Sequence, residues 1–98
     1  MHAVVNHMKL SRPLDGDIIE RMNSELMSDI GKMPGVVQGL CVQVADDGIV
    51  VVVVCESEDF LERVHQEVGL PWVRDNLKPY LAGTDRKTGP VIARPQNR

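Results

Sequence analysis

Cysteine, positive charge and long apolar runs are all scarce in this sequence. The 98-residue chain has two cysteines, Cys41 and Cys55, without the close spacing of a zinc or redox pair. Its 11 Lys and Arg are outnumbered by 14 Asp and Glu, and this balance argues against a nucleic-acid-binding protein. The longest apolar run, Ile49 to Cys55, is too short to span a bilayer, and residues 1–10 lack the continuous apolar core of a signal peptide. We therefore expect a cytoplasmic protein with reduced thiols and no nucleic-acid or membrane partner.

The length predicts a single domain covering residues 1–98. A domain of this size buries roughly 60–65% of the surface that its unfolded chain exposes, which leaves a thin stability margin. Association with a second copy of the chain would widen that margin.

The first part of the chain has the pattern of a strand followed by an amphipathic helix. Residues 2–10 alternate as a strand does, and one face would carry Val4, Asn6, Met8 and Leu10. Asp15 is a suitable N-cap for the helix, which we expect to end at Gly31 or at Pro34-Gly35. Its apolar positions recur at helical spacing: Ile18, Ile19, Met22, Leu26, Ile30 and Met33.

A β-hairpin is expected next, from strands at 36–44 and 49–55. Asp46-Asp47-Gly48 would form its turn, because Asp-Gly suits a hairpin that needs positive φ. In this register Cys41 and Cys55 would not face each other, so we expect no disulfide.

A second helix and a last strand complete the chain. The helix is expected to start at Ser57, to break or kink at Pro71, and to stop by Gly83. Its apolar positions fall into two stripes, Phe60-Leu61-Val64-Val68 and Val73-Leu77-Leu81. Thr88 to Arg94 is the expected last strand. This order predicts an α+β, ferredoxin-like βαββαβ fold, with a four-stranded antiparallel sheet, the first and third strands central and both helices on one face.

The valine-rich strand at 49–55 predicts a homodimer. In a sheet with helices on one face only, strands should alternate apolar and polar residues. This strand directs valines to both faces, and a second copy of the sheet could cover the otherwise exposed one. The alternative is that central strands are rich in valine simply because β-branched residues suit strands.

Three segments carry a family resemblance: Met33-Pro34-Gly35-Val36-Val37 before a strand, Glu56-Ser57-Glu58-Asp59-Phe60 opening a helix, and Leu77-Lys78-Pro79-Tyr80-Leu81-Ala82-Gly83 closing it. They resemble the dimeric α+β barrel superfamily, in its antibiotic-biosynthesis-monooxygenase-like and stress-responsive A/B-barrel branches. The resemblance implies a homodimer whose two sheets form a barrel, with a pocket between sheet and helices in each subunit. Activities in the family include oxygenation of aromatic polyketides and quinols without a bound cofactor, and haem degradation.

Asn6 is the first candidate for a functional residue. It would lie among apolar neighbours on the helix side of the first strand, where a polar group needs a partner. Segment 6–10 resembles the first strand of oxygenating and haem-degrading relatives, which implies that Asn6 polarises substrate or oxygen. The alternative is a purely structural hydrogen bond from Asn6 to a loop.

Trp72, Asn76 and Tyr80 are the second candidates, because their spacing places them on one helix face. They could wall a pocket, with Trp72 as a catalytic residue and the polar groups of Asn76 and Tyr80 orienting the substrate. Met8 and Met22 could line the same pocket for a flat apolar ligand. The alternative is ordinary packing of all these side chains.

We expect neither a metal nor a bound cofactor. In the haem-degrading branch a histidine of the second helix binds the iron, and Trp72 falls at that position here, whereas His65 lies about two turns earlier. His65 is therefore interpreted as a partly exposed helix residue. No three or four ligand side chains group together, as a metal site would require.

The sequence leaves three functional hypotheses open. The first is a cofactor-independent monooxygenase acting on an aromatic or quinol-like substrate. The second is a non-catalytic module that binds a small molecule, and the third is a protein that only dimerises. The scarcity of aromatic residues, one each of Trp, Tyr and Phe, favours the second and third, because oxygenases of aromatic substrates often stack them.

Overall fold

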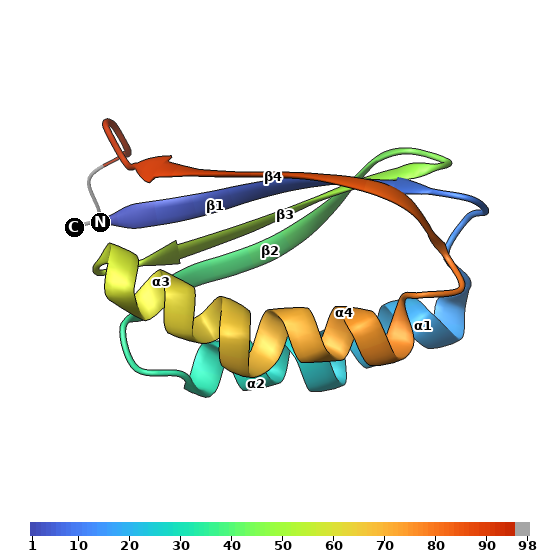
Figure 1. Ribbon diagram of the computed structural model, residues 1–98, viewed down its shortest axis with the longest axis horizontal. Coiled ribbons are helices and arrows are strands. Elements are labelled where there is room, and N and C mark those ends of the chain that lie inside the picture. The colour runs from blue at the N-terminus through green and yellow to red at the C-terminus, as the bar shows by residue number, and fades with distance from the viewer. Residues whose placement is uncertain (96–98) are drawn as a thin grey trace.

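The computed structural model describes residues 1–95 and places a β-sheet against a layer of helices (Figure 1). The strands are β1 (His2–Leu10), β2 (Val36–Ala45), β3 (Gly48–Cys55) and β4 (Leu81–Pro90). They pair antiparallel in the order β2-β3-β1-β4, so β1 and β3 are central. The expected ferredoxin-like α+β fold is thereby confirmed, with the helices on one face of the sheet (Figure 1).

Each helical stretch contains a π-helical segment between two α-helical ones. The first consists of α1 (Gly16–Arg21), η1 (Met22–Met27) and α2 (Ser28–Lys32), and the second of α3 (Glu58–Val64), η2 (His65–Gly69) and α4 (Leu70–Asn76). Asp15 caps the first, its carboxylate accepting from the Ile18 amide at 2.9 Å, and Ser57 caps the second by accepting from the Phe60 amide at 3.3 Å. No helix within residues 1–95 is both long and apolar enough to cross a membrane.

Pro71 does not break the second helix, so of the two outcomes expected from the sequence, a break or a kink, the break is wrong. The helical ribbon is continuous from α3 to α4 (Figure 1). Pro71 lies in the first turn of α4, immediately after the π-helical η2. Within this continuous helix Pro71 has no N–H to donate to the preceding turn, and the π-helical turn directly before it is where the helix departs from α-helical pairing. The helix therefore changes type before the proline instead of ending.

The last strand and the end of the second helix correct the sequence-based boundaries. The helix ends at Asn76, not near Gly83, and β4 starts at Leu81, not at Thr88. Leu81 fits the helical stripe, and the residues after it are too polar to signal a strand. Pairing with β1 along its length supplies the backbone hydrogen bonds that make this segment a strand.

The β2–β3 hairpin turns at Asp46-Asp47, but without the expected positive φ. The one described residue with positive φ is Gly35, at 80°, and a Cβ there would collide with the Phe60 ring. The pairing is irregular near both ends of β2, and Cys41 lies opposite Val51. Cys41 and Cys55 are free thiols, and burial raises the pKa of each.

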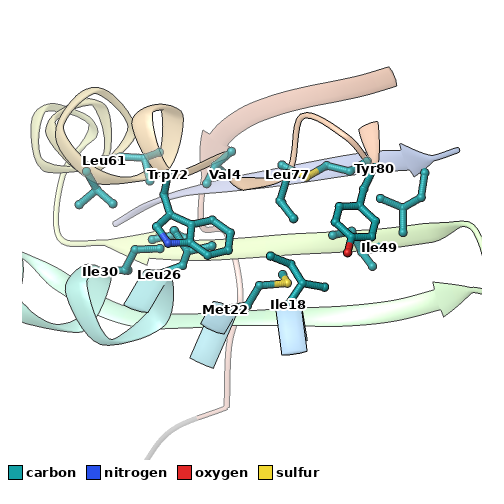
Figure 2. Packing of buried hydrophobic residues seen from close by; sticks show 14 of the residues in the cluster. Val4, Ile18, Met22, Leu26, Ile30, Ile49, Leu61, Trp72, Leu77 and Tyr80 are labelled. Atoms are coloured by element: carbon teal, nitrogen blue, oxygen red, sulfur yellow. The ribbon is translucent and has the colours of Figure 1, made fainter. Parts of the chain in front are cut away.

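The two faces of the sheet have different surroundings. The helix-covered face carries the core, in which Leu26, Leu61 and Trp72 of the helices pack together (Figure 2). The opposite face, which we call the outer face, is apolar over β2 and β3, where it carries Leu40, Val42, Val50, Val52 and Val54. Over β1 and β4 it is mixed, with Val5 beside His7, Asp85 and Lys87. Of these, Val5, Leu40 and Val42 are 36–45% exposed in the single chain.

Candidate functional site

A cavity of about 160 Å³ lies between the helix-covered face of the sheet and the helices. Strands β1, β3 and β4 contribute one side, and both π-helical segments contribute to the other, through Met22 and Leu26 of η1 and through His65 and Gly69 of η2. Such segments recur at functional sites in proteins. Leu70 and Thr84 are the exposed lining residues, so the cavity opens between α4 and β4.

The cavity wall is apolar except for four residues, which are Asn6, His65, Thr84 and Arg86. No Phe, Tyr or Trp is among the lining residues, and neither is any Asp or Glu. Mostly apolar walls with a few polar groups are typical of small-molecule sites. The site can therefore hold an apolar body and bind polar atoms at a restricted place.

Asn6 and Arg86 form the polar part of the cavity. Asn6 of β1 is directly opposite Arg86 of β4 in the antiparallel register, so both side chains lie on the same face of the sheet. The Oδ1 atom of Asn6 and one terminal nitrogen of Arg86 are buried and have no hydrogen-bond partner among the described residues. An unsatisfied buried polar group destabilises a fold by about 1–3 kcal/mol. Both atoms are therefore available for hydrogen bonds with the polar atoms of a ligand.

His65 also lines the cavity, from the first position of η2. Its pKa is lowered, first by burial and then by the positive charge of Arg86, while Glu62 partly opposes the change. The imidazole is thus neutral at pH 7 and can accept a hydrogen bond or a proton. His65 is half-buried, as the sequence predicted, but its place in the cavity wall was not foreseen.

Of the six residues that the sequence singled out, three line the cavity: Asn6, Met8 and Met22. The other three, Trp72, Asn76 and Tyr80, are not among its lining residues, which corrects the expectation that they wall it together. Tyr80 lies in the turn that follows α4, which ends at Asn76, so the helical spacing does not extend to it. Trp72 and Asn76 do lie on α4, but they face the first helical stretch, where they are hydrogen-bonded to Glu25 and Arg21.

Trp72, Asn76 and Tyr80 instead connect the two helical stretches. The Trp72 indole N–H donates to the Glu25 carboxylate at 3.1 Å, and Arg21 donates to the Asn76 side-chain oxygen. The Trp72 ring belongs to the same buried core cluster as Leu26 (Figure 2). The hydrogen bond from Arg21, and then that from Trp72, lower the pKa of Glu25.

The Tyr80 hydroxyl donates to the Asp15 carboxylate at 2.7 Å. This bond is the main cause of the lowered pKa of Asp15, and it raises the pKa of Tyr80. The carboxylate that caps the first helix is thereby tied to the turn before β4, which fixes that turn beside the start of the helix.

Sequence reasoning missed Arg86 and Thr84 because it placed the last strand too late. With β4 at 81–90, alternation assigns Thr84, Arg86 and Thr88 to one face and Asp85 and Lys87 to the other. With the correct strand boundary, the sequence would have placed Arg86 on the core side of the last strand, and a charged residue at such a position indicates a candidate binding site. Within the described part of the chain, no three His, Cys, Asp or Glu side chains converge as a metal site requires.

No protein-family model matches this sequence, and no curated protein matches it by sequence. Solved structures do match. SnoaB, a cofactor-independent oxygenase from Streptomyces nogalater, superposes with a TM-score of 0.74 at 14% identity, over 95% of this chain and 94% of its own. ActVA-Orf6 of Streptomyces coelicolor, a monooxygenase in complex with nanaomycin D, gives a TM-score of 0.74 at 16% identity, over 99% and 92%.

MhuD, in a structure with two manganese protoporphyrin IX molecules per active site, gives a TM-score of 0.68 at 13% identity, over 99% of this chain and 100% of its own. At such identities, the likeness concerns the fold. It extends over almost the whole described chain, and it agrees with the resemblance carried by the strand-entry and helix-end segments. The chain therefore has the α+β fold of the antibiotic-biosynthesis-monooxygenase-like proteins.

Proposed function

We propose that this protein binds a small, mainly apolar molecule in the cavity between sheet and helices, and acts on it as a cofactor-independent monooxygenase. The observation that carries the proposal is an apolar cavity lined by two cross-strand neighbours, Asn6 and Arg86, each with one buried polar atom that has no partner among residues 1–95. Ligand atoms would satisfy both and would remove the associated destabilisation.

The chemistry requires a substrate that can itself reduce oxygen, such as a phenol or quinol. A ring C–H is replaced by a carbonyl: one atom of O₂ remains in the product, and the other leaves as water together with the two hydrogens that the phenol gives up. The protein supplies a dry, oriented site for this reaction. Asn6 polarises substrate or oxygen, and the neutral imidazole of His65 accepts the proton that the phenol releases.

Oxygen consumption by the purified protein, measured with a panel of hydroquinones and polyketide-like phenols, tests the proposal. We expect turnover with at least one member, and a rate reduced roughly 10²-fold or more in the variant Asn6→Ala. Asn23→Ala is the matched control, because Asn23 is exposed on the first helix. If no member of the panel is oxidised, the protein is not this kind of oxygenase, and an undiminished rate in Asn6→Ala would remove Asn6 from the mechanism.

A haem is not a fitting occupant of the cavity. An engineered apolar cavity of about 150 Å³ accommodates benzene, so the space here corresponds to one ring and not to a porphyrin. We therefore derive no step through haem.

A non-catalytic binding module is the second candidate, and one observation favours it: the cavity wall has no aromatic side chain of Phe, Tyr or Trp on which a substrate could stack. Saturable binding of at least one member of the same panel, with no oxygen consumption for any member, would establish this candidate over the first. A protein that only dimerises would bind none of them.

We further propose that the protein is a homodimer joined through the outer face of the sheet. Val5, Leu40 and Val42 lie on that face with 36–45% of their surface exposed, around the half-buried valines of β3. Val42→Glu should yield a monomer in light scattering, whereas Ile19→Glu, at a similarly exposed helix position, should leave the dimer intact. A monomeric parent protein would refute this part of the proposal.

A further inference from the structure

The size of the cavity limits the ligand to about one ring. Its 160 Å³ is close to the volume of an engineered apolar cavity that binds benzene, about 150 Å³. Both helical stretches and three strands enclose it, and most of the lining side chains are buried core residues. A ligand of several fused rings would have to displace these side chains, at the expense of a close-packed core, or leave its further rings outside in the opening between α4 and β4.

The polar atoms of the cavity determine which hydrogen-bonding groups a ligand ring must have at its edge. The Oδ1 atom of Asn6 is an acceptor and requires a donor, whereas the terminal nitrogen of Arg86 is a donor and requires an acceptor. Cross-strand neighbours have Cβ atoms about 5 Å apart, so a single ligand edge can reach both side chains. The ligand therefore presents one O–H donor and one oxygen acceptor close together.

The charge of the site determines whether the ligand oxygen that accepts from Arg86 is neutral or anionic. Arg86 brings a permanent positive charge, and no Asp or Glu is among the residues that line the cavity. His65, the other titratable lining residue, faces the same space and offers no negative charge. The buried terminal nitrogen of Arg86, which has no carboxylate partner among residues 1–95, favours an anionic oxygen, since charge-assisted hydrogen bonds are the stronger kind.

We propose that the ligand is a single aromatic ring with two adjacent oxygen substituents, one ionised and bound to Arg86, the other a hydroxyl that donates to Asn6: a catecholate-type compound. This inference rests on the proposed function, because it specifies the small molecule that the cavity binds. It goes further in excluding substrates with several fused rings and in assigning the anion to Arg86.

Isothermal titration calorimetry at neutral pH with four probes tests the inference. 4-Nitrocatechol has one ring, an acidic hydroxyl and an adjacent one; 4-nitrophenol lacks the adjacent hydroxyl; alizarin has the same pair of hydroxyls on three fused rings; toluene has no polar atom. We expect 4-nitrocatechol to bind most tightly, 4-nitrophenol about 3- to 10-fold more weakly, and alizarin not measurably.

Two variants and a control assign the contacts. Arg86→Met should weaken 4-nitrocatechol by about 10-fold or more and leave toluene unchanged, because only the former binds through a charge. Asn6→Leu should remove the preference for 4-nitrocatechol over 4-nitrophenol. Arg74→Met is the matched control, since Arg74 is exposed on α4 outside the cavity. Arg86→Gln replaces Arg86→Met if the latter does not fold.

The outcomes separate this inference from the proposed function. Alizarin binding as tightly as 4-nitrocatechol, or an affinity unaffected by either Arg86 variant, would overturn the catecholate assignment. Toluene binding without any preference for 4-nitrocatechol would leave the cavity as a ligand site and reject its anionic edge. If none of the four probes binds, the inference and the proposed function both fail.

Discussion

Removal of the Leu26 side chain should both destabilise the protein and enlarge its cavity. Leu26 lies on η1, is 2% exposed, and belongs at once to the core and to the cavity wall. Buried Leu→Ala changes destabilise proteins by about 2–5 kcal/mol, and the value increases with the volume left empty. Because one side of Leu26 already borders open space, it has fewer neighbours to lose. We therefore expect a loss of about 2.5–3.5 kcal/mol, in the lower part of that range.

Urea denaturation, followed by the fluorescence of the single tryptophan, Trp72, measures this loss. Parent and variant must be compared at one protein concentration, because the stability of a dimer depends on it. Ile19→Ala is the control, since Ile19 is 41% exposed on the first helix and should change the free energy of unfolding by only about 0.5 kcal/mol or less. In parallel, Leu26→Ala should bind a two-ring ligand such as 2-naphthol more tightly than the parent does.

The two readouts together can refute the reasoning. A loss below about 1 kcal/mol would mean that Leu26 is not packed as the core requires. A full loss of stability without any gain in 2-naphthol affinity would mean that Leu26 does not border the ligand cavity.

The remaining predictions concern the backbone and two titrating groups. Gly35→Ala should destabilise the protein by more than about 1 kcal/mol, because Gly35 has a positive φ. Gly31→Ala should instead stabilise it by about 0.5–1 kcal/mol, because Gly31 lies in a helix with free space around it. Equal effects of the two changes in thermal denaturation would contradict this reasoning. The pKa of His65 is lowered by burial and by the positive charge of Arg86, so the free energy of unfolding should fall as the pH decreases from about 6.5 through that lowered pKa. If His65→Gln has the same dependence of the free energy of unfolding on pH as the parent, His65 is not the group responsible. The Tyr80 hydroxyl lowers the pKa of Asp15, so the contribution of Asp15 to the free energy of unfolding should be present above the ordinary pKa of 3.8 and be lost as the pH falls through the lowered value. Tyr80→Phe should therefore reduce the decrease in melting temperature between these pH values. An identical pH profile of the melting temperature in the variant and the parent would refute the link.

Apolar periodicity was sufficient to place the first helix and the start of the second, and the resulting order of elements predicted the sheet order. It worked where local pattern and tertiary environment agree, as in β1, where Val4, Met8 and Leu10 are buried. It failed for β4, whose polar residues become a strand through pairing with β1. Since Arg86 lies on that strand, the error in the boundary also concealed half of the polar part of the site.

The cavity itself could not be read from the sequence. Its shape is the space that packed side chains leave, and packing depends on which helix faces which strand. The same holds for Trp72, because nothing local to α4 indicates that its indole N–H reaches Glu25 on the first helical stretch. Asn6 was identified correctly as a polar residue on a buried face because strand alternation alone determines that.

The π-helical segment η2 has a consequence for how the chain tolerates a change in length. An α-helix turns by about 100° per residue, so a helix that carries one residue more or less presents a different side afterwards. In the second helical stretch Leu61 and Val64 before η2, and Val73 and Leu77 after it, all reach the cavity, although their spacing does not fit one uninterrupted α-helical stripe. The wide turn absorbs the odd residue. Deleting Gln66 should therefore convert η2 to an ordinary α-helical turn while Val73 and Leu77 keep facing the sheet, so the fold should tolerate the loss of this residue.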